Sequence, residues 1–315
     1  MSGVRHAHSL PGLPRERGAA LLVVLWVVML LGLLASAFAV DTAGQARDTR
    51  TALDAAMARA RAEGAIWQGV LELLAGRQDV VIALDGQPFE LDLDADDPDR
   101  DTGSLRLSVQ ALRGRIDINH ADAAQLAALF GRYVEDDSRR DALVDAVQDF
   151  RDADDLRRLH GAEADDYRRA GLAHGPADRP FADVAELALV IGMDRRLYQR
   201  LLPLVTVHGE RSVDRLVAPS EVLMALPGAT SGQVEALLAL RADSPPPAVS
   251  RFARGSGHVV EMLASARQPG GVSRGVRAVV RLHPGQREPY TILEWQHHSR
   301  DLFAATSMVA GEDDR

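Results

Sequence analysis

The sequence predicts an α+β protein in which one long helix packs on an antiparallel sheet and a large helical insertion interrupts that sheet. Three observations support this prediction. Residues 18–75 combine an uncharged apolar run with an amphipathic segment, and contain no proline. Short runs that alternate apolar and polar residues occur near both ends of the remaining chain. The stretch between them has the pattern of short helices and contains a repeat.

The apolar run is long enough to cross a membrane as one helix. No charged residue lies between Arg17 and Asp41, and about 20 apolar residues suffice to cross a bilayer core of roughly 30 Å. Basic residues precede the run at Arg5, Arg15 and Arg17, so we expect a cytoplasmic N-terminus and a single span at 19–41. The segment ASAFA at 35–39 is typical of a signal-peptide cleavage site, and a cleaved signal peptide is the alternative.

Apolar or small residues then continue at helical spacing from 42 to 75. They recur at Ala43, Ala46, Leu53, Ala56, Ala60, Trp67, Val70, Leu71 and Leu74. One helix of about 55 residues would be roughly 80 Å long at 1.5 Å per residue.

The short basic leader, Gly18 and this long helix resemble a type IV pilin-like precursor. The resemblance implies a cleaved leader at 1–18, which the prepilin peptidase removes between Gly18 and Ala19. The fifth residue of the mature chain would be Val23, where most pilin-like proteins have Glu. Absence of that Glu is a feature of the K-type minor pseudopilins of type II secretion, although an ordinary pilin that lost its Glu and a plain signal anchor share it.

Strands are predicted on both sides of the insertion. DVVIAL (79–84), PFELDLD (88–94) and SLRLSVQ (104–110) precede it, and runs at 258–267, 275–283 and 290–297 follow it. Glycine- or proline-rich segments separate these runs, as in antiparallel sheets. With the helix, segments 42–115 and 207–315 would form a type IV pilin-like domain.

The insertion, at 116–206, and the segment that follows it contain a repeat that resembles helix-hairpin-helix or SAM-like modules. ADAAQLAALFG (121–131), ADVAELALVIG (182–192) and APSEVLMALPG (218–228) share their first, sixth and last residues, and the third copy would open a second hairpin at about 218–241. The shared Leu126, Leu187 and Leu223 are predicted core residues. The shared Gly131, Gly192 and Gly228 are predicted to end helices in the left-handed conformation.

The segment 144–209 and its flanks resemble the K-type minor pseudopilin family closely. The resemblance rests on GAE (161–163), Tyr167, RPF (179–181) and GM (192–193), and on GRIDIN and RLVAPSEVLMALPG at the starts of the two helical modules. It implies a tip subunit that initiates or caps the pseudopilus for protein export, with its bulk in the periplasm. Its implied partners are the I- and J-type minor pseudopilins, other pseudopilus subunits, the prepilin peptidase and the inner membrane.

Composition argues against two other function classes. The chain carries a net charge of −9 and all of its basic residues are Arg, while residues 117–206 contain 18 acidic and 12 basic residues. We therefore expect no nucleic-acid partner. Because helix-hairpin-helix modules bind DNA in other proteins, the alternative function is a membrane-anchored helix-hairpin-helix DNA receptor of a competence-type system. There is no cysteine, and no HExxH or phosphate-loop motif, so we expect no catalytic residues and no enzyme activity.

An acidic cluster is the candidate metal site. Asp149, Asp152 and Asp154, with Glu163 a short loop later, place carboxylates together, and Ca²⁺ takes 6–8 oxygen ligands. Association of the resembled family with calcium supports an ion there, although no cofactor is required by the fold. A solvated loop in which Arg151, Arg157 and Arg158 balance the charge is the alternative.

Overall fold

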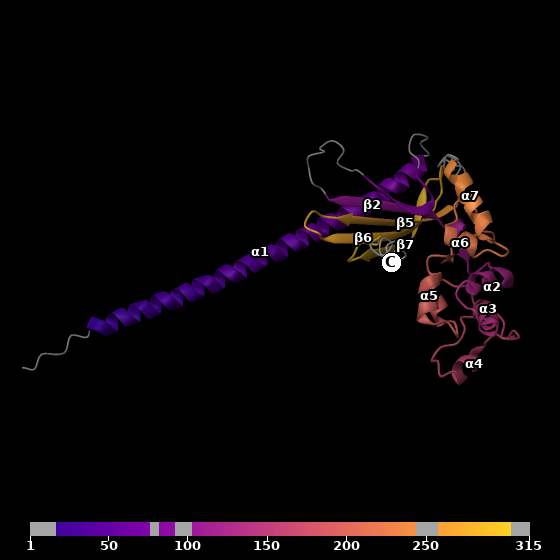
Figure 1. The fold of residues 1–315 in the computed structure, drawn as a ribbon, viewed down its shortest axis with the longest axis horizontal. Helices are drawn as coiled ribbons and strands as arrows, with labels where there is room; N and C mark the ends of the chain where they lie inside the picture. The colour runs from indigo at the N-terminus through magenta and orange to yellow at the C-terminus, as the bar shows by residue number, and fades with distance from the viewer. Residues whose placement is uncertain (1–16, 76–81, 92–102, 244–257, 304–315) are drawn as a thin grey trace, which may run out of the picture. The chain divides into compact units, whose positions relative to one another are not determined.

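The computed structural model describes residues 17–75, 82–91, 103–243 and 258–303 of the 315-residue chain (Figure 1). The leader predicted at 1–18 lies almost entirely outside the described residues. Contacts divide the chain into two units, residues 1–54 and 55–315. Each unit is described separately below.

The long N-terminal helix is confirmed as α1 (Arg17–Ala75). In the first unit its described side chains between Leu21 and Leu34 are exposed, with Leu21 at 73%, Trp26 at 67% and Leu34 at 64%. Within the described residues, no helix combines the length and the hydropathy of a candidate membrane span.

The second unit contains a five-stranded antiparallel sheet in the order β1-β2-β5-β6-β7. Its strands are β1 (Asp85–Glu90), β2 (Ser104–Ala111), β5 (His258–Arg267), β6 (Ser273–Leu282) and β7 (Tyr290–His298). The pairing of β2 with β5 joins strands from both sides of the insertion, as the alternating runs predicted. All four predicted runs from 104 onward are strands.

The prediction for the first strand is wrong. Residues 82–84 form no strand, while 79–81 lie outside the described residues. Strand β1 instead begins at Asp85, in the segment that was expected to separate the first two runs as a turn. The register of β1 against β2 shifts between Asp85 and Pro88. Gly86, with φ 82°, provides the left-handed residue that this irregularity needs, so glycine and proline mark a bulged edge strand here and not a turn.

One face of the sheet packs on the second half of α1. Ala58, Ala62, Ile66 and Leu73 of the helix are buried against alternate residues of the strands, such as Met262. A Cβ at Gly69 would lie 3.2 Å from the Leu107 side chain. The small residues of this helical face therefore bring helix and sheet close together and bury a continuous apolar core.

The helical insertion starts and ends at a pair of short parallel strands, β3 (Ile116–Asp117) and β4 (Val205–Thr206). Between them lie α2 (Ala123–Gly131), α3 (Asp137–Arg151), α4 (Ala164–Arg169), the 3₁₀ helix η2 (Val184–Leu189) and α5 (Arg195–Leu201). The buried carboxylate of Asp117 accepts hydrogen bonds from the Asn119 N–H at 2.7 Å and the Gly209 N–H at 2.8 Å. One carboxylate thus joins the start of the insertion to the chain that leaves it.

The repeat is confirmed as a core pattern but only partly as a pattern of turns. Leu126, Leu187 and Leu223 are each at most 2% exposed in one apolar core. Gly192 and Gly228 have φ of 83° and 71°, as predicted. Gly131 is the last residue of α2 and does not have positive φ, so the left-handed prediction is wrong at this position.

A second hairpin follows at α6 (Ser220–Met224) and α7 (Ser231–Asp243). A short 3₁₀ turn, η1 (Leu112–Gly114), connects β2 to β3. A Cβ on Gly114 would lie 2.6 Å from the Val217 carbonyl oxygen, so only glycine lets these two connecting segments touch. Figure 1 shows α6 and α7 beside the ends of the strands, and α2–α5 grouped further from the sheet.

Candidate functional site

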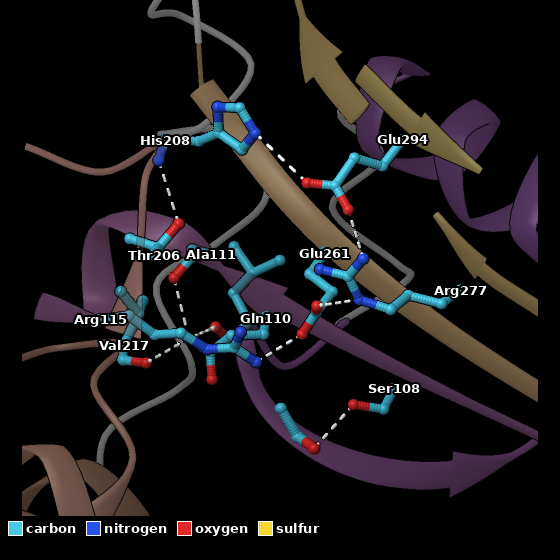
Figure 2. A network of polar contacts seen from close by, with 12 residues as sticks. Ser108, Gln110, Ala111, Arg115, Thr206, His208, Val217, Glu261, Arg277 and Glu294 are labelled. Carbon is cyan, nitrogen blue, oxygen red and sulfur yellow. Dashed lines mark hydrogen bonds and ion pairs between the residues drawn. The ribbon is translucent and has the colours of Figure 1, made fainter. Parts of the chain in front are cut away.

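A buried carboxylate on the second face of the sheet lies where the insertion joins the strands. Glu261 on β5 is 5% exposed. It accepts hydrogen bonds from Arg115, which precedes β3, and from Nε of Arg277 on β6, the latter at 2.6 Å (Figure 2). Burial alone would raise the pKa of Glu261, but the two guanidinium groups outweigh burial and lower it. Glu261 is therefore held ionised between the sheet and the first residues of the insertion.

The network continues to the end of the insertion through β7. Arg277 also donates to Glu294, whose other carboxylate oxygen lies 3.4 Å from Nε2 of His208 (Figure 2). The hydrogen bond with His208, opposed by burial and supported by Arg277, lowers the pKa of Glu294 to about 2. Because His208 lies two residues after the end of β4, the same chain of charges binds both ends of the insertion to the sheet.

Gln110 on β2 completes this junction without charge. Its buried side-chain amide donates to the carbonyl oxygens of Ala111 at 2.8 Å and Val217 at 3.1 Å, and is 3.3 Å from that of Leu84. These carbonyl groups belong to the sheet, to the segment before β1 and to the segment before α6. Together with Glu261 and Glu294, Gln110 makes the junction a buried polar network, which fixes orientation because each member loses its partners if the insertion moves.

An irregularity in the pairing of β7 with β6 determines which of its side chains lie on each face of the sheet. Val279 pairs with Glu294 and Val280 pairs with Ile292, so a β-bulge at Leu293 interrupts the alternation. As a result Glu294 points to the polar network, while Ile292 and Trp295 both lie on the helix side of the sheet.

A second site, the acidic loop, follows α3. Asp149 is fully buried and accepts from Nη1 of Arg158 at 2.6 Å and from the Ala162 N–H at 2.9 Å. Arg158 also pairs with Asp152. A Cβ on Gly161 would lie 1.9 Å from Oδ2 of Asp149. The buried carboxylate of Asp149 therefore requires glycine at position 161, in the GAE segment. Its hydrogen bonds with Arg158 and Ala162 hold the loop in place.

Three further carboxylates gather beside this loop. Oxygen atoms of Asp155, Glu163 and Asp178 all lie within 4.8 Å of one another. Glu163 is 8% exposed, and among the described residues neither of its carboxylate oxygens has a hydrogen-bond partner. Burial, with the charges of nearby Asp149, Asp152, Asp178 and Asp155, raises the pKa of Glu163 to about 7. The three carboxylates offer the oxygen ligands that a hard cation such as Ca²⁺ binds. A bound cation would also give the buried carboxylate of Glu163 the partner that it otherwise lacks.

The structure separates the residues that the sequence proposed as metal ligands. Asp149 and Asp152 pair with Arg158, and Asp154 accepts from the Leu156 N–H at 2.9 Å. Only Glu163 belongs both to the predicted set and to the cluster in space. Asp178 was missed as a candidate ligand because it lies far from the other carboxylates along the chain. Its φ of 51°, which is unusual for a non-glycine residue, is visible only in the structure.

Two of the predicted processing residues are described only in part. Gly18 and Ala19 lie within α1, and only their backbone is described. Val23, at the position of the pilin Glu, is 61% exposed.

Comparisons with known proteins agree on one family. Residues 105–210 match the family model described as Type II secretion system (T2SS), protein K. The chain is 32% identical over 221 residues to Type II secretion system protein K of Klebsiella pneumoniae, covering 63% of this chain and 65% of that protein. It is 38% identical over 90 residues to the protein of the same name from Dickeya chrysanthemi, covering 29% and 23%. The chain thus spans just under two thirds of the first relative and less than a quarter of the second.

A solved structure shows a similar fold. One chain of the crystal structure of the GspK-GspI-GspJ complex from the enterotoxigenic Escherichia coli type 2 secretion system aligns with a TM-score of 0.50 and 17% identity. The alignment covers 82% of this chain and 99% of that chain. The mixed helical and antiparallel-sheet fold of this chain is therefore similar to that of a solved structure.

The junction predicts a specific loss of stability in acid. Because the pKa of Glu294 is lowered to about 2 in the folded state, its contribution is present above the unfolded pKa of about 4.5 and is lost as pH falls toward 2. Glu294→Gln should remove at most roughly 3 kcal/mol at pH 7 and less at pH 3. Urea unfolding at both pH values measures this difference. Glu135→Gln, at an exposed position, is the matched control; an equal effect of both variants would contradict the assignment.

Proposed function

We propose, from the premise that the chain belongs to the type II secretion system protein K family, that it is the minor pseudopilin at the tip of the type II secretion pseudopilus. In this position it initiates or caps assembly of the pseudopilus and takes part in protein export across the outer membrane. Its role is structural and not catalytic. The comparisons do not favour the alternative of a membrane-anchored DNA receptor.

The junction between insertion and sheet is the observation that carries this proposal. A type IV pilin-like body consists of the helix and the sheet, and here the insertion adds a second helical core to it. Glu261, Gln110 and Glu294 fix that core to the strands by buried contacts. A body broadened by a fixed element obstructs the addition of a further subunit above it, which is the property of an end piece.

The N-terminal helix supports a membrane-anchored form of this subunit. Leu21, Trp26 and Leu34 belong to a stretch whose large apolar side chains are all exposed, and such a surface favours lipid or an apolar partner over water. The proposed inner-membrane span covers residues 19–41, and within it side-chain exposure is described for residues 21–36 and 38. The N-terminus would be cytoplasmic and the rest periplasmic, with the prepilin peptidase cutting between Gly18 and Ala19.

We propose the I- and J-type minor pseudopilins as direct partners. The solved structure of similar fold is a complex of GspK with GspI and GspJ. A carboxylate in lipid needs a partner, which for the pilin Glu would come from a neighbouring subunit. Val23 needs no such partner, and this supports a position with no subunit above.

Calcium is proposed as a structural ion of the acidic loop. Asp155, Glu163 and Asp178 would supply its carboxylate ligands, and Ca²⁺ would neutralise their mutual repulsion. Asp149 and Arg158 shape the loop without contributing to this set. The ligand set predicted from the sequence, Asp149, Asp152, Asp154 and Glu163, differs from this set in a testable way.

Processing gives the first prediction. Mass spectrometry of the protein from cells with an active prepilin peptidase should find a mature chain that starts at Ala19, because glycine leaves the scissile bond accessible. Gly18→Leu should leave the precursor uncut, and Gly32→Leu, in the same helix, should be processed normally. A chain that begins after Ala39 would identify a signal peptide and contradict the anchored pseudopilin.

Partner binding gives the second prediction. The body lacking residues 1–41 should co-purify with I- and J-type bodies and should not bind DNA at physiological salt, because the insertion is acidic. Salt-sensitive, micromolar DNA binding without pseudopilin binding would favour the DNA receptor instead.

Calcium gives the third prediction. In chelator, the raised pKa of Glu163 means that its contribution to stability is fully present below the unfolded pKa of about 4.5 and is lost as pH rises through about 7. Calcium should reverse this loss and raise the melting temperature, with a stabilisation of about 2.7 kcal/mol at a hundredfold excess over Kd.

Matched variants distinguish the two ligand sets. Asp178→Asn should abolish most of the calcium effect, whereas Asp154→Asn should retain it because Asn can still accept from the Leu156 N–H. Glu163→Gln should abolish the effect with either set, because Glu163 belongs to both. Loss of the effect in Asp154→Asn and not in Asp178→Asn would support the sequence-based set, and identical melting curves in calcium and chelator would exclude both.

A further inference from the structure

A hollow opens on one side of helix α3, within the helical insertion. Its apolar wall consists of Ala142, Leu143 and Ala146 of α3 and of Ile191, which follows η2. The three α3 residues span a single turn, so their side chains lie on one side of the helix. The hollow has a volume of about 330 Å³ and is open to solvent. This volume is at the lower end of the range for protein sites that hold a ligand.

Small residues keep this α3 hollow free of side chains. Gly161 and Gly192 both line it. Position 161 requires glycine because a Cβ there would lie 1.9 Å from Oδ2 of Asp149, and Gly192 has a φ of 83°. Ala142 is half-buried and leaves space that a larger apolar residue would fill. Because protein interiors are packed closely, an apolar space that the chain leaves unfilled is suited to a side chain from outside.

Two leucines on the loop beside the α3 hollow are exposed to water. Leu156 is 77% exposed and Leu159 is 84% exposed, which exceeds the 73% of Leu21 in the apolar part of α1. Leu159 directly precedes His160, and His160 lines the hollow. Exposed apolar side chains beside an apolar hollow are typical of a surface that binds another molecule.

The polar groups around the α3 hollow are engaged with one another. Nη2 of Arg139 lies 2.6 Å from Oδ2 of Asp194. Asp145 accepts a hydrogen bond from the His160 N–H at 3.0 Å, and Asp166 pairs with an arginine of its own helix. A site for a small molecule usually contains convergent polar groups that are free to orient the ligand. The α3 hollow is therefore better suited to an apolar side chain of a protein.

The surface around the α3 hollow is negatively charged. Residues 135–169 contain 12 acidic and 7 basic residues. Each of the seven arginines has a hydrogen-bond or ion-pair partner among the described residues. The excess charge therefore belongs to carboxylates, and it attracts a positively charged partner.

We propose that the α3 hollow binds a large apolar side chain of another protein, from a segment in which Arg or Lys residues flank that side chain. The apolar side chain enters between Ala142 and Ile191. Leu156 and Leu159 contact the adjoining residues of the segment, while its cations face the surrounding carboxylates. This site goes beyond the assembly role proposed above, because it belongs to the insertion and neither to α1 nor to the sheet.

Peptide binding to the full chain in detergent tests this inference. The probe is a fluorescent peptide that has one Phe at its centre and two Arg on each side. A control peptide has Ala in place of the Phe and keeps all of the charges. We expect fluorescence anisotropy to show that the Phe peptide binds at least about tenfold more tightly, because only this peptide can bury an aromatic side chain.

Matched substitutions locate the binding site. Ala142→Phe fills the α3 hollow and should weaken binding of the Phe peptide at least about tenfold. Ala124→Phe, at an exposed position of α2, is the control and should leave binding unchanged. Leu159→Ser changes an exposed side chain and should weaken binding severalfold at an unchanged melting temperature. Asp145→Asn retains an acceptor for His160 but removes a charge, so it should weaken binding and reduce its dependence on salt.

The outcomes decide for or against the α3 hollow. Equal affinities of the Phe and Ala peptides, or no binding of either, would overturn the proposed apolar anchor. Equal affinities of Ala142→Phe and Ala124→Phe for the Phe peptide would place the binding site elsewhere. If Ala142→Phe fails to fold, Leu159→Ser decides, and unchanged binding by this variant overturns the proposal. The peptides bind without other pseudopilins present, so failure here leaves the proposed function intact.

Discussion

The carboxylate of Glu261 is the contact on which the position of the helical insertion depends. It lies between Arg115, at the start of the insertion, and Arg277 in the sheet, and removal of one partner of such a buried pair costs about 3–5 kcal/mol because an unpaired charge remains. Glu294 repeats the arrangement toward His208 at the other end. The insertion is therefore joined to the strands through charge at both of its ends, in a chain that has no disulfide to do so.

The acidic loop follows the same physical logic with one difference. Asp149, like Glu261, is buried and satisfied, by Arg158 and backbone N–H groups, so it organises the loop. Glu163 is buried without a partner among the described residues. Its pKa is raised because burial and the nearby carboxylates disfavour its ionised form. One carboxylate thus completes the protein's own structure, while the other requires a proton or a cation from solution.

Local patterns predicted the elements well, and long-range contacts explain the failures. Spacing alone identified α1, the strands β2, β5, β6 and β7 and the buried Leu126, because each depends on neighbours along the chain. Glycine was a less reliable guide, since it marks a bulge at position 86 and the end of a helix at 131. The pairing of Arg115 with Glu261 spans 146 residues, so no local signal could reveal it. Asp178 was missed for the same reason, because only the fold brings it to Glu163.

The most direct measurement is the distance between insertion and sheet in solution. A cysteine pair at exposed positions, Arg195→Cys on α5 and Thr291→Cys on β7, allows spin labelling of a chain that has no other thiol. We predict one narrow distance distribution, which Glu261→Gln broadens because the ion pairs at the start of the insertion are lost. A broad distribution in the otherwise unaltered protein would show an insertion that moves independently of the sheet, and would contradict its proposed role as the fixed, widened end of the pseudopilus.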